Sequence, residues 1–508
     1  MSTRFDKFRK VLNTVDRRSV LGKGAAVVGG LMAAQFIKPR AAEAQTRPAA
    51  RPADKTFTVT VGGEIMATRP FAMQTEPEFL DLVKLYRNSD LSVGHLEMNF
   101  GTDEEIQWTP RGTAGVASYM ITEPQVAHDL KWMGFHALSL AHNHSFDWGP
   151  QGIFATIKHV KAAGMGHAGT GADLEEARAP GYFEVDKARV GMVSVGSGNN
   201  LYEWAGYGKG KIPGRPGMNP LRVSTRYHVP KEVAAQLKAA GKGLGVLSDA
   251  AAARPQFNIV PGGGAGAGTG TATFAFVESD KYDITSTGHA RDIEGNLRSI
   301  DEAMKMSDFV VVQHHNSTSE GARGPDPSEF VVDFARKSID AGADIYIGHG
   351  WHTFLGIEIY KGKPIIYGTG NFIYQSNFLT RIPPDSYESY GFDLDKLSIL
   401  NKVSGDTTMH PGGGQEDWLW SAVPQFVYTD GKVTEIRLYP YDMGYDFSSG
   451  KGVPYRTIGR GSYKYLDGSP RLAYGANGQE ILKRVQAQCA RRNTKMDIVG
   501  NIGVIKVA

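Results

Sequence analysis

The sequence predicts an α/β fold, and three features support that prediction. From Phe57 onward, apolar strand-like runs alternate with amphipathic helical stretches, a pattern typical of sheets covered by helices. Hydrophobic residues make up 41% of the 508 residues and charged residues 21%, so the chain can bury a large core and global disorder is excluded. Histidine and glycine cluster where the strand-like runs end, which is where α/β proteins carry reactive side chains.

The expected elements follow in order along the chain. The β-rich runs are short and apolar: Phe57–Val61, Leu91–Leu96, Ala137–Leu140, Val190–Val195, Thr273–Val277, Phe309–Val312, Ile345–Ile347 and Pro364–Tyr367. Helical periodicity marks the stretches Glu78–Arg87, Pro124–Met133, Gly152–Ala163, Ile300–Met306 and Ser328–Ala341. Near the carboxyl terminus, a hairpin of Trp418–Tyr428 and Val433–Tyr439 precedes a final helix over Gly478–Arg491.

Two stretches interrupt this alternation and predict loop insertions near residues 197–271 and 380–416. The first contains PGGGAGAGTGT at 261–271, which lacks the Lys and Ser/Thr of a P-loop and the acidic residue of a dinucleotide site. A flexible insertion is therefore favoured over a phosphate-binding loop. We expect residues 57–508 to form a single domain that carries these insertions.

Residues 1–44 have the features of an export signal. Basic residues that include the pair Arg17-Arg18 precede a mildly apolar run over Gly24–Ile37, which ends near Ala42-Glu43-Ala44. The run is too short to remain as a membrane anchor. The arginine pair resembles a twin-arginine signal, with an ordinary secretory signal as the alternative. We therefore expect a periplasmic or otherwise extracytoplasmic protein, with residues 45–56 as a flexible leader.

Charge and cysteine content exclude several kinds of partner and site. Residues 1–44 hold nine of the 56 basic and three of the 53 acidic residues, so the rest of the chain has a net charge of −3. Broad electrostatic binding to nucleic acid or to an anionic membrane is therefore not expected. Cys489 is the only cysteine, which excludes an intrachain disulfide and argues against a closed structural zinc site.

Half of the 14 histidines gather in four short stretches, each of which follows an apolar run. They are His95, His142 with His144, His314 with His315, and His349 with His352. Glu64 follows its strand in the same way, and Glu97 comes two residues after His95. A single histidine of this kind is usually structural, but the grouping favours an open catalytic site for Zn, Mn or Fe, which imidazole and carboxylate ligands suit. Asp147, which precedes a helix, is expected in the turn or as a partner that orients an imidazole.

Six ordered motifs carry a resemblance to a known family. They are GGEIM at 62–66, DLSVGHLE at 90–97, AHNH at 141–144, VVQHH at 311–315, GHGWH at 348–352 and the stretch from Lys363-Pro364 to Gly370-Asn371-Phe372. The chain resembles the CapA-like poly-γ-glutamate capsule-synthesis proteins, whose fold is similar to that of the calcineurin-like metallophosphoesterases. The resemblance covers nearly all of the chain after the signal. It implies a sandwich of two sheets flanked by helices, in four αββα layers.

The resemblance also implies a site. One or two divalent ions would be held by Glu64, Glu97, Asn143, His315, His349 and His352, with His144 as a general acid and Asn371 in a loop that shapes the site. The sequence departs from the family's pattern at Glu64, where the family has Asp, and at His95 and His142, where it has Asn. The two added imidazoles offer further ligands or proton-transfer groups, so His95 and His142 join His144 as candidate catalytic residues.

Three functions fit these residues. The first is hydrolysis of an amide, peptide-like or phosphoester bond with a metal-activated water. The second is epimerisation or elimination at the same metal site, with His95 and His142 as bases. The third is a non-catalytic envelope component that handles an anionic polymer together with assembly partners. A small-molecule, peptide-like or polymeric substrate fits the sequence equally well.

Overall fold

The computed structural model describes residues 56–107, 119–198, 202–259, 274–318, 326–375, 418–446, 453–454 and 468–507. All of them belong to one compact unit, Pro48–Ala508. The expected signal, the expected leader except Thr56, and the expected insertion at 380–416 lie outside the described residues. Within the described ranges, no helix combines the length and apolar character that crossing a membrane requires.

The first large sheet is mixed, with parallel strands at its centre. In spatial order it consists of β25 (Asp497–Val499), β26 (Ile502–Lys506), β21 (Lys432–Asp442), β20 (Trp420–Thr429), β1 (Thr56–Met66), β2 (Leu91–Leu96), β5 (Ala137–Ser139) and β6 (Gly166–Ala168). Two short strands lie off this path: β19 (Asn371–Tyr374) pairs with β1, and β24 (Arg471–Leu472) pairs with β21. β1, β2, β5, β6 and β19 run parallel, so their carboxyl ends meet at one edge.

The second large sheet has a parallel centre and antiparallel edges. Its order is β17 (Ile357–Tyr360), β18 (Lys363–Ile366), β16 (Ile345–His349), β15 (Phe309–Asn316), β9 (Ala188–Ser197) and β8 (Gly181–Val185). The four inner strands are parallel, whereas β17 and β8 are antiparallel to their neighbours.

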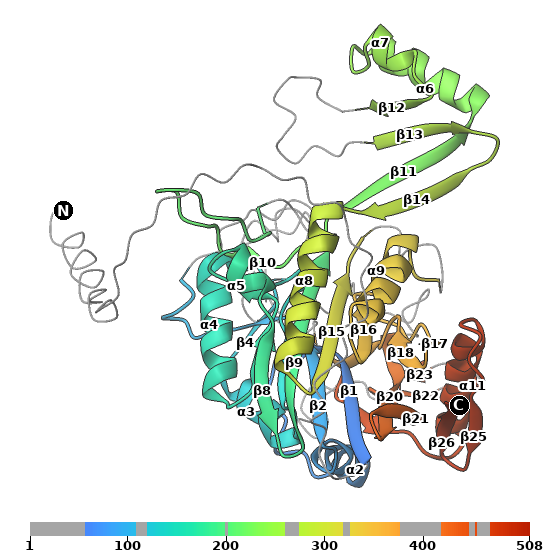
Figure 1. The fold of residues 1–508 in the computed structure, drawn as a ribbon. Helices are drawn as coiled ribbons and strands as arrows, with labels where there is room; N and C mark the ends of the chain where they lie inside the picture. Colours follow the sequence, from blue (N-terminus) through green and yellow to red (C-terminus); the bar gives the residue numbers. More distant parts are fainter. Residues whose placement is uncertain are drawn as a thin grey trace, which may run out of the picture. The chain divides into compact units, whose positions relative to one another are not determined.

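Three apolar clusters show that the sheets and helices form four layers (Figure 1). Helices α2 (Pro77–Arg87), α3 (Gln125–Met133) and α4 (Gly149–Ala162) pack on the outer face of the first sheet. Helices α8 (Ala290–Met306) and α9 (Glu329–Asp340) pack on the outer face of the second. The middle cluster joins the inner faces of both sheets and includes α11 (Gly475–Ala490). The predicted αββα sandwich is confirmed.

Smaller elements complete the described chain. A four-stranded sheet has the order β12 (Gln256–Ile259), β13 (Phe274–Ser279), β11 (Val223–Pro230) and β14 (Asp283–Gly288), and it carries α6 (Lys231–Gly243) and α7 (Asp249–Ala252). The remaining elements are short: α5 (Leu174–Arg178) and the ladders β3–β4 (Asn99–Phe100, Ile121–Thr122), β7–β10 (Thr170–Gly171, Gly217–Met218) and β22–β23 (Tyr445–Asp446, Val453–Pro454). Much of the expected insertion at 197–271 is therefore regular structure in its described part, while 261–271 lies outside it.

Several strands are longer than the sequence predicts. β15 continues to Asn316 and β16 to His349, so His314, His315 and His349 lie within strands rather than in the loops after them. His95 also lies within a strand, because β2 has the predicted bounds Leu91–Leu96. Polar residues at these strand ends hide the strand from a hydrophobic pattern, yet the ladder hydrogen bonds continue through them.

Candidate metal centre

Strand alternation decides which histidines face the space between the sheets. On β15, Val311 belongs to the middle apolar cluster, whereas Val310 and Val312 belong to the outer one. Successive side chains of a strand point to opposite faces, so His315 lies on the inner face and His314 on the outer face. His314 is buried among outer-layer aromatic rings, and its two ring nitrogens lie 2.6 Å from the Tyr346 hydroxyl and 2.9 Å from the Ser197 hydroxyl. His314 is therefore a structural residue.

Glu64 lies near the end of β1, just after a glycine pair that interrupts the strand register. A β-bulge separates Val61 and Glu64 in the pairing with β2. The backbone N–H of Glu64 donates to the Gly370 carbonyl at 3.0 Å, and a Cβ on Gly63 would lie 2.0 Å from that carbonyl oxygen. Only glycine at position 63 permits this approach. The GG of the motif thus brings the loop before β19 against the Glu64 backbone.

Glu64, Glu97 and His352 form a compact group of ligand atoms. One carboxylate oxygen or ring nitrogen from each lies within 4.8 Å of the others. His352 Nδ1 is 2.5 Å from Glu64 Oε2, 3.9 Å from Glu97 Oε2 and 2.8 Å from Asn371 Oδ1. The other Glu64 oxygen accepts from the Gly350 N–H at 2.6 Å. His352 has a φ of 57°, in the left-handed region that only a few per cent of non-glycine residues adopt.

Several side-chain atoms at this edge that could bind a metal have no hydrogen-bond partner among the described residues. Glu97 Oε2, Asn143 Oδ1 and His315 Nε2 are buried, and none of them has a hydrogen-bond partner among the described residues. His315 Nε2 lies 3.8 Å from Glu97 Oε1. Buried polar atoms normally find partners, and carboxylate, amide and imidazole groups are the ligands that Zn, Mn and Fe accept. The residues present therefore fit a divalent cation.

The electrostatics of the two carboxyl groups differ. Burial opposes ionisation of Glu64, but the adjacent His352 outweighs it and holds the pKa of Glu64 well below its usual value. Burial raises the pKa of Glu97 well above its usual value and outweighs the lowering effect of His352, and the nearby charge of Glu64 adds a smaller rise. Burial disfavours the charged His352, yet Glu64 and Glu97 raise its pKa to about 10. Without a cation, the His352 imidazolium thus neutralises the Glu64 carboxylate, while the carboxyl group of Glu97 favours its protonated form.

A chain of hydrogen bonds runs from His315 into the core. His315 Nδ1 lies 2.9 Å from His95 Nε2, His95 Nδ1 lies 3.0 Å from the Ser139 hydroxyl, and Ser139 lies 2.7 Å from the Ser194 hydroxyl. If His315 offers the Nε2 lone pair to a cation, its Nδ1 must carry the proton and donate to His95. His95 must then donate from Nδ1 to Ser139. Both nitrogens of the fully buried His95 are therefore engaged.

His349 lies beneath His95, with their rings stacked at a centroid distance of 4.3 Å. Its Nε2 is 2.9 Å from Gln313 Oε1 and its Nδ1 is 2.9 Å from the Thr369 hydroxyl. Burial lowers the pKa of His349 to about 3. His349 is thus a neutral imidazole whose two nitrogens both contact protein groups in this structure.

The turn after β5 carries the remaining candidates. His144 Nδ1 lies 2.7 Å from Asp147 Oδ2, which also accepts from the Met120 N–H at 2.8 Å. Asp147 therefore orients an imidazole, and no side chain caps the start of α4. His142 is buried with its ring edge-on to those of His95 and His315, and its Nδ1 accepts from the His144 N–H at 3.2 Å.

The structure brings the predicted site residues to one edge of the sandwich, with different surroundings. Glu64, Glu97, His315 and His352 are linked by the short distances above, and Asn143 lies between His142 and His144 with an unpartnered oxygen. Their role as ligands stays a prediction. Sequence reasoning missed the partners Ser139, Ser194, Gln313 and Thr369. Alternation could have found Gln313, two residues before His315, but Ser139 follows only from its register opposite His95.

Comparison with known proteins identifies the family. The model of the bacterial capsule synthesis protein PGA_cap matches residues 27–376, more than half of the chain. The protein y4sH of Sinorhizobium fredii is 28% identical over 459 residues, which is 89% of this chain and 93% of that protein. The PGA biosynthesis protein CapA of Bacillus subtilis is 23% identical over 66% of this chain and 68% of its own length. The capsule biosynthesis protein CapA of Bacillus anthracis is 22% identical over 73% and 72%. The chain therefore belongs to the CapA-like PGA_cap family, with its metallophosphoesterase-like fold.

Proposed function

We propose that this protein is an exported enzyme that hydrolyses an amide bond of a glutamyl, peptide-like chain with the help of a divalent cation. The observation that carries the proposal is the set of buried atoms of Glu97, Asn143 and His315 that have no hydrogen-bond partner among the described residues, beside the Glu64–His352 pair. Such atoms cost free energy unless a ligand satisfies them. The choice of a glutamyl amide rests on the names of the relatives, which are PGA and capsule biosynthesis proteins.

The ligands would come from several strands. Glu64, Glu97, Asn143, His315 and His352 would hold the cation, and His349 remains a predicted ligand that would first have to exchange one of its present hydrogen bonds. A divalent cation at such a site lowers the pKa of water toward ~7 and polarises the scissile carbonyl group.

Proton transfer is assigned to His144. Its Nδ1 is held by Asp147, which leaves Nε2 as the nitrogen that can exchange a proton with a substrate. His144 Nε2 would protonate the leaving amine, and Asp147 would stabilise the imidazolium before that transfer.

His95 is assigned a positioning role in place of the proton-transfer role that the sequence suggests. Both of its nitrogens are engaged, with His315 and with Ser139, and its side chain is fully buried. It fixes the tautomer of His315 that presents a lone pair at Nε2. This arrangement gives no support to an epimerase or lyase that uses His95 as a base.

Two measurements test the proposal. The purified protein is expected to contain stoichiometric Zn, Mn or Fe, and to release new amino groups from a γ-linked glutamate oligomer in a chelator-sensitive reaction. Glu97→Ala is expected to lose both metal and turnover, whereas His144→Gln is expected to keep the metal and lose turnover. Hydrolysis of phosphoesters alone would show that the substrate is a phosphoester and not an amide. Deuterium uptake by unhydrolysed substrate would indicate an epimerase. Turnover that does not depend on a metal would refute the proposal.

Export is tested separately. Fusion of residues 1–44 to a reporter that is active only outside the cytoplasm is expected to give a signal, and Arg17→Lys with Arg18→Lys is expected to abolish it. A signal that survives the paired substitution would point to an ordinary secretory route.

A further inference from the structure

The four-stranded sheet has two unlike faces. Phe257 and Phe276 form an apolar cluster with Val229, Ala234 and Leu247, which joins the sheet to α6 and its following turn. On β12, Gln256 and Asn258 flank Phe257, and on β11, Arg226 precedes Tyr227, which pairs with Phe276. Because side chains alternate along a strand, these three polar residues point away from that cluster. This face is therefore polar.

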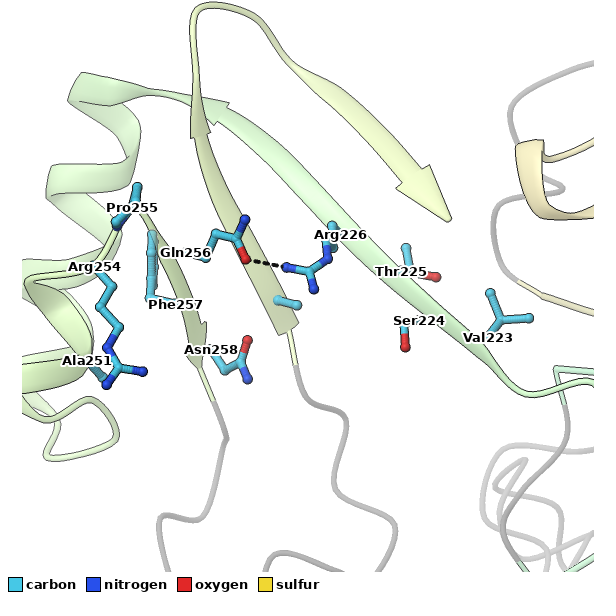
Figure 2. Close-up of a pocket in the computed structure, with 11 residues that line it drawn as sticks. Val223, Ser224, Thr225, Arg226, Ala251, Arg254, Pro255, Gln256, Phe257 and Asn258 are labelled. Carbon is cyan, nitrogen blue, oxygen red and sulfur yellow. Dashed lines mark hydrogen bonds between the residues drawn. The ribbon is translucent and has the colours of Figure 1, made fainter. Parts of the chain in front are cut away.

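A cavity of about 840 Å³ borders this polar region (Figure 2). Its polar lining comes from Ser224, Thr225, Arg226, Arg254, Gln256 and Asn258. In Figure 2, Gln256 and Asn258 on β12 lie between Arg254, at the end of the α7 turn, and Arg226 on β11. The volume lies within the range of roughly 300–1,000 Å³ that small ligands occupy.

The two arginines lack carboxylate partners in the part of the chain that the structure describes. Arg226 Nη1 donates to the neutral Gln256 Oε1 at 2.7 Å, and no described ion pair includes Arg226 or Arg254. No described residue that lines the cavity is acidic.

Three acidic residues of this sheet and its helices have lysine partners. Glu278 pairs with Lys238, Asp249 pairs with Lys242 at 2.6 Å, and Asp283 pairs with Lys281 at 3.3 Å. The cavity thus keeps two positive charges that its described lining residues do not neutralise.

We propose that this cavity binds side-chain carboxylates of a glutamyl chain and forms an anchoring site with no residue in common with the metal centre. Guanidinium groups bind carboxylates through paired N–H donors, and the amides of Gln256 and Asn258 can donate to further oxygens. Glutamyl polymers carry one carboxylate per residue, so two arginines can engage neighbouring residues of one chain. The choice of this ligand rests on the proposed function.

The test measures binding without turnover. The full-length protein is treated with chelator, and the anisotropy of a fluorescent γ-linked glutamate oligomer is recorded during titration. The double variant Arg226→Gln/Arg254→Gln is expected to bind about tenfold more weakly, since two exposed charge-assisted contacts are lost. The matched double variant Lys242→Gln/Lys281→Gln removes the same charge from paired residues outside the cavity and is expected to change affinity less than twofold.

Each other result overturns the proposal. Equal weakening in both double variants would indicate general electrostatic attraction, and no weakening in the arginine variant would show that the cavity is not used. Loss of binding in Glu97→Gln alone would place the chain at the metal centre instead. Equally tight binding of polyphosphate would show a general anion site. Because turnover is absent throughout, a failure of the hydrolase proposal leaves this measurement interpretable.

Discussion

Replacement of His95 by leucine should weaken metal binding although His95 is not proposed as a ligand. The substitution removes the acceptor for His315 Nδ1 at 2.9 Å and the group that contacts Ser139 at 3.0 Å. His315 is then left with a buried N–H that has lost its partner, which costs about 1–3 kcal/mol. The imidazole can avoid that cost by turning or by changing tautomer, either of which removes the lone pair from Nε2. At about 1.4 kcal/mol per tenfold, the expected loss of metal affinity is roughly 5- to 150-fold.

The assay is calorimetric titration of Zn²⁺ into chelator-treated protein, with ¹⁵N NMR of the histidine rings to report the His315 tautomer. His95→Gln is the matched control, because its amide oxygen can accept from His315 Nδ1 and should restore most of the affinity. Urea unfolding of the metal-free proteins separates this effect from a general loss of stability. The reasoning is refuted if His95→Leu binds zinc as tightly as the wild type, or if His95→Gln is as weak as His95→Leu.

Other predictions follow from single contacts. His314→Ala should lower the free energy of unfolding by about 3 kcal/mol, because two side-chain hydrogen bonds and a buried ring are lost, and it should leave the metal content unchanged. His315→Ala should instead reduce the metal content and lower the free energy of unfolding less. Metal analysis and urea unfolding that gave the opposite pattern would show that the two roles are exchanged. Burial, with a smaller effect of nearby positive charge, lowers the pKa of His167 to about 4. Between pH ~6.5 and ~4 the unfolded chain therefore binds a proton at His167 that the folded protein does not bind. The free energy of unfolding should fall as the pH drops through this range, by up to about 1.4 kcal/mol per pH unit. His167→Asn should reduce the difference between urea midpoints at pH 5 and pH 7, and an unchanged difference would contradict this. Gly63→Ala would place a Cβ 2.0 Å from the Gly370 carbonyl oxygen, so we expect about 1–3 kcal/mol of destabilisation together with reduced metal content; an unaltered melting temperature would argue against the close approach.

The layered fold could be predicted because each layer leaves a local trace in the sequence. Runs such as Leu91–Leu96 and Val190–Val195 are mostly apolar, as expected for parallel strands buried on both faces, and they recur as β2 and as part of β9. The ends were harder to predict. β15 runs on through Gln313 to Asn316, because backbone pairing with β9 and β16 continues where the side chains become polar.

The residue types of the candidate site could be predicted from the sequence, but the contacts between these residues could not. Spacing alone could not separate His314 from His315, since the decision depends on which face of β15 meets the helices. The link from His95 to Ser139 depends on strand register, and the opposite character of Glu64 and Glu97 depends on which of them His352 approaches most closely. These are properties of three-dimensional packing, which a single sequence does not encode locally.

The charge balance of the metal-free centre leads to a final prediction. Two buried carboxyl groups lie beside one imidazole, and His352 with its pKa near 10 together with the raised pKa of Glu97 shows that protons supply the positive charge there. A divalent cation bound by these same groups needs their lone pairs, so it must displace at least the His352 proton. Apparent affinity for Zn²⁺ should therefore rise about tenfold per pH unit for each proton released between pH 6 and 8, and titration in weakly buffered solution should show acidification. His352→Gln should reduce that proton release. A zinc affinity that does not change with pH would refute His352 as a ligand, because its ring cannot bind the cation while both nitrogens carry protons.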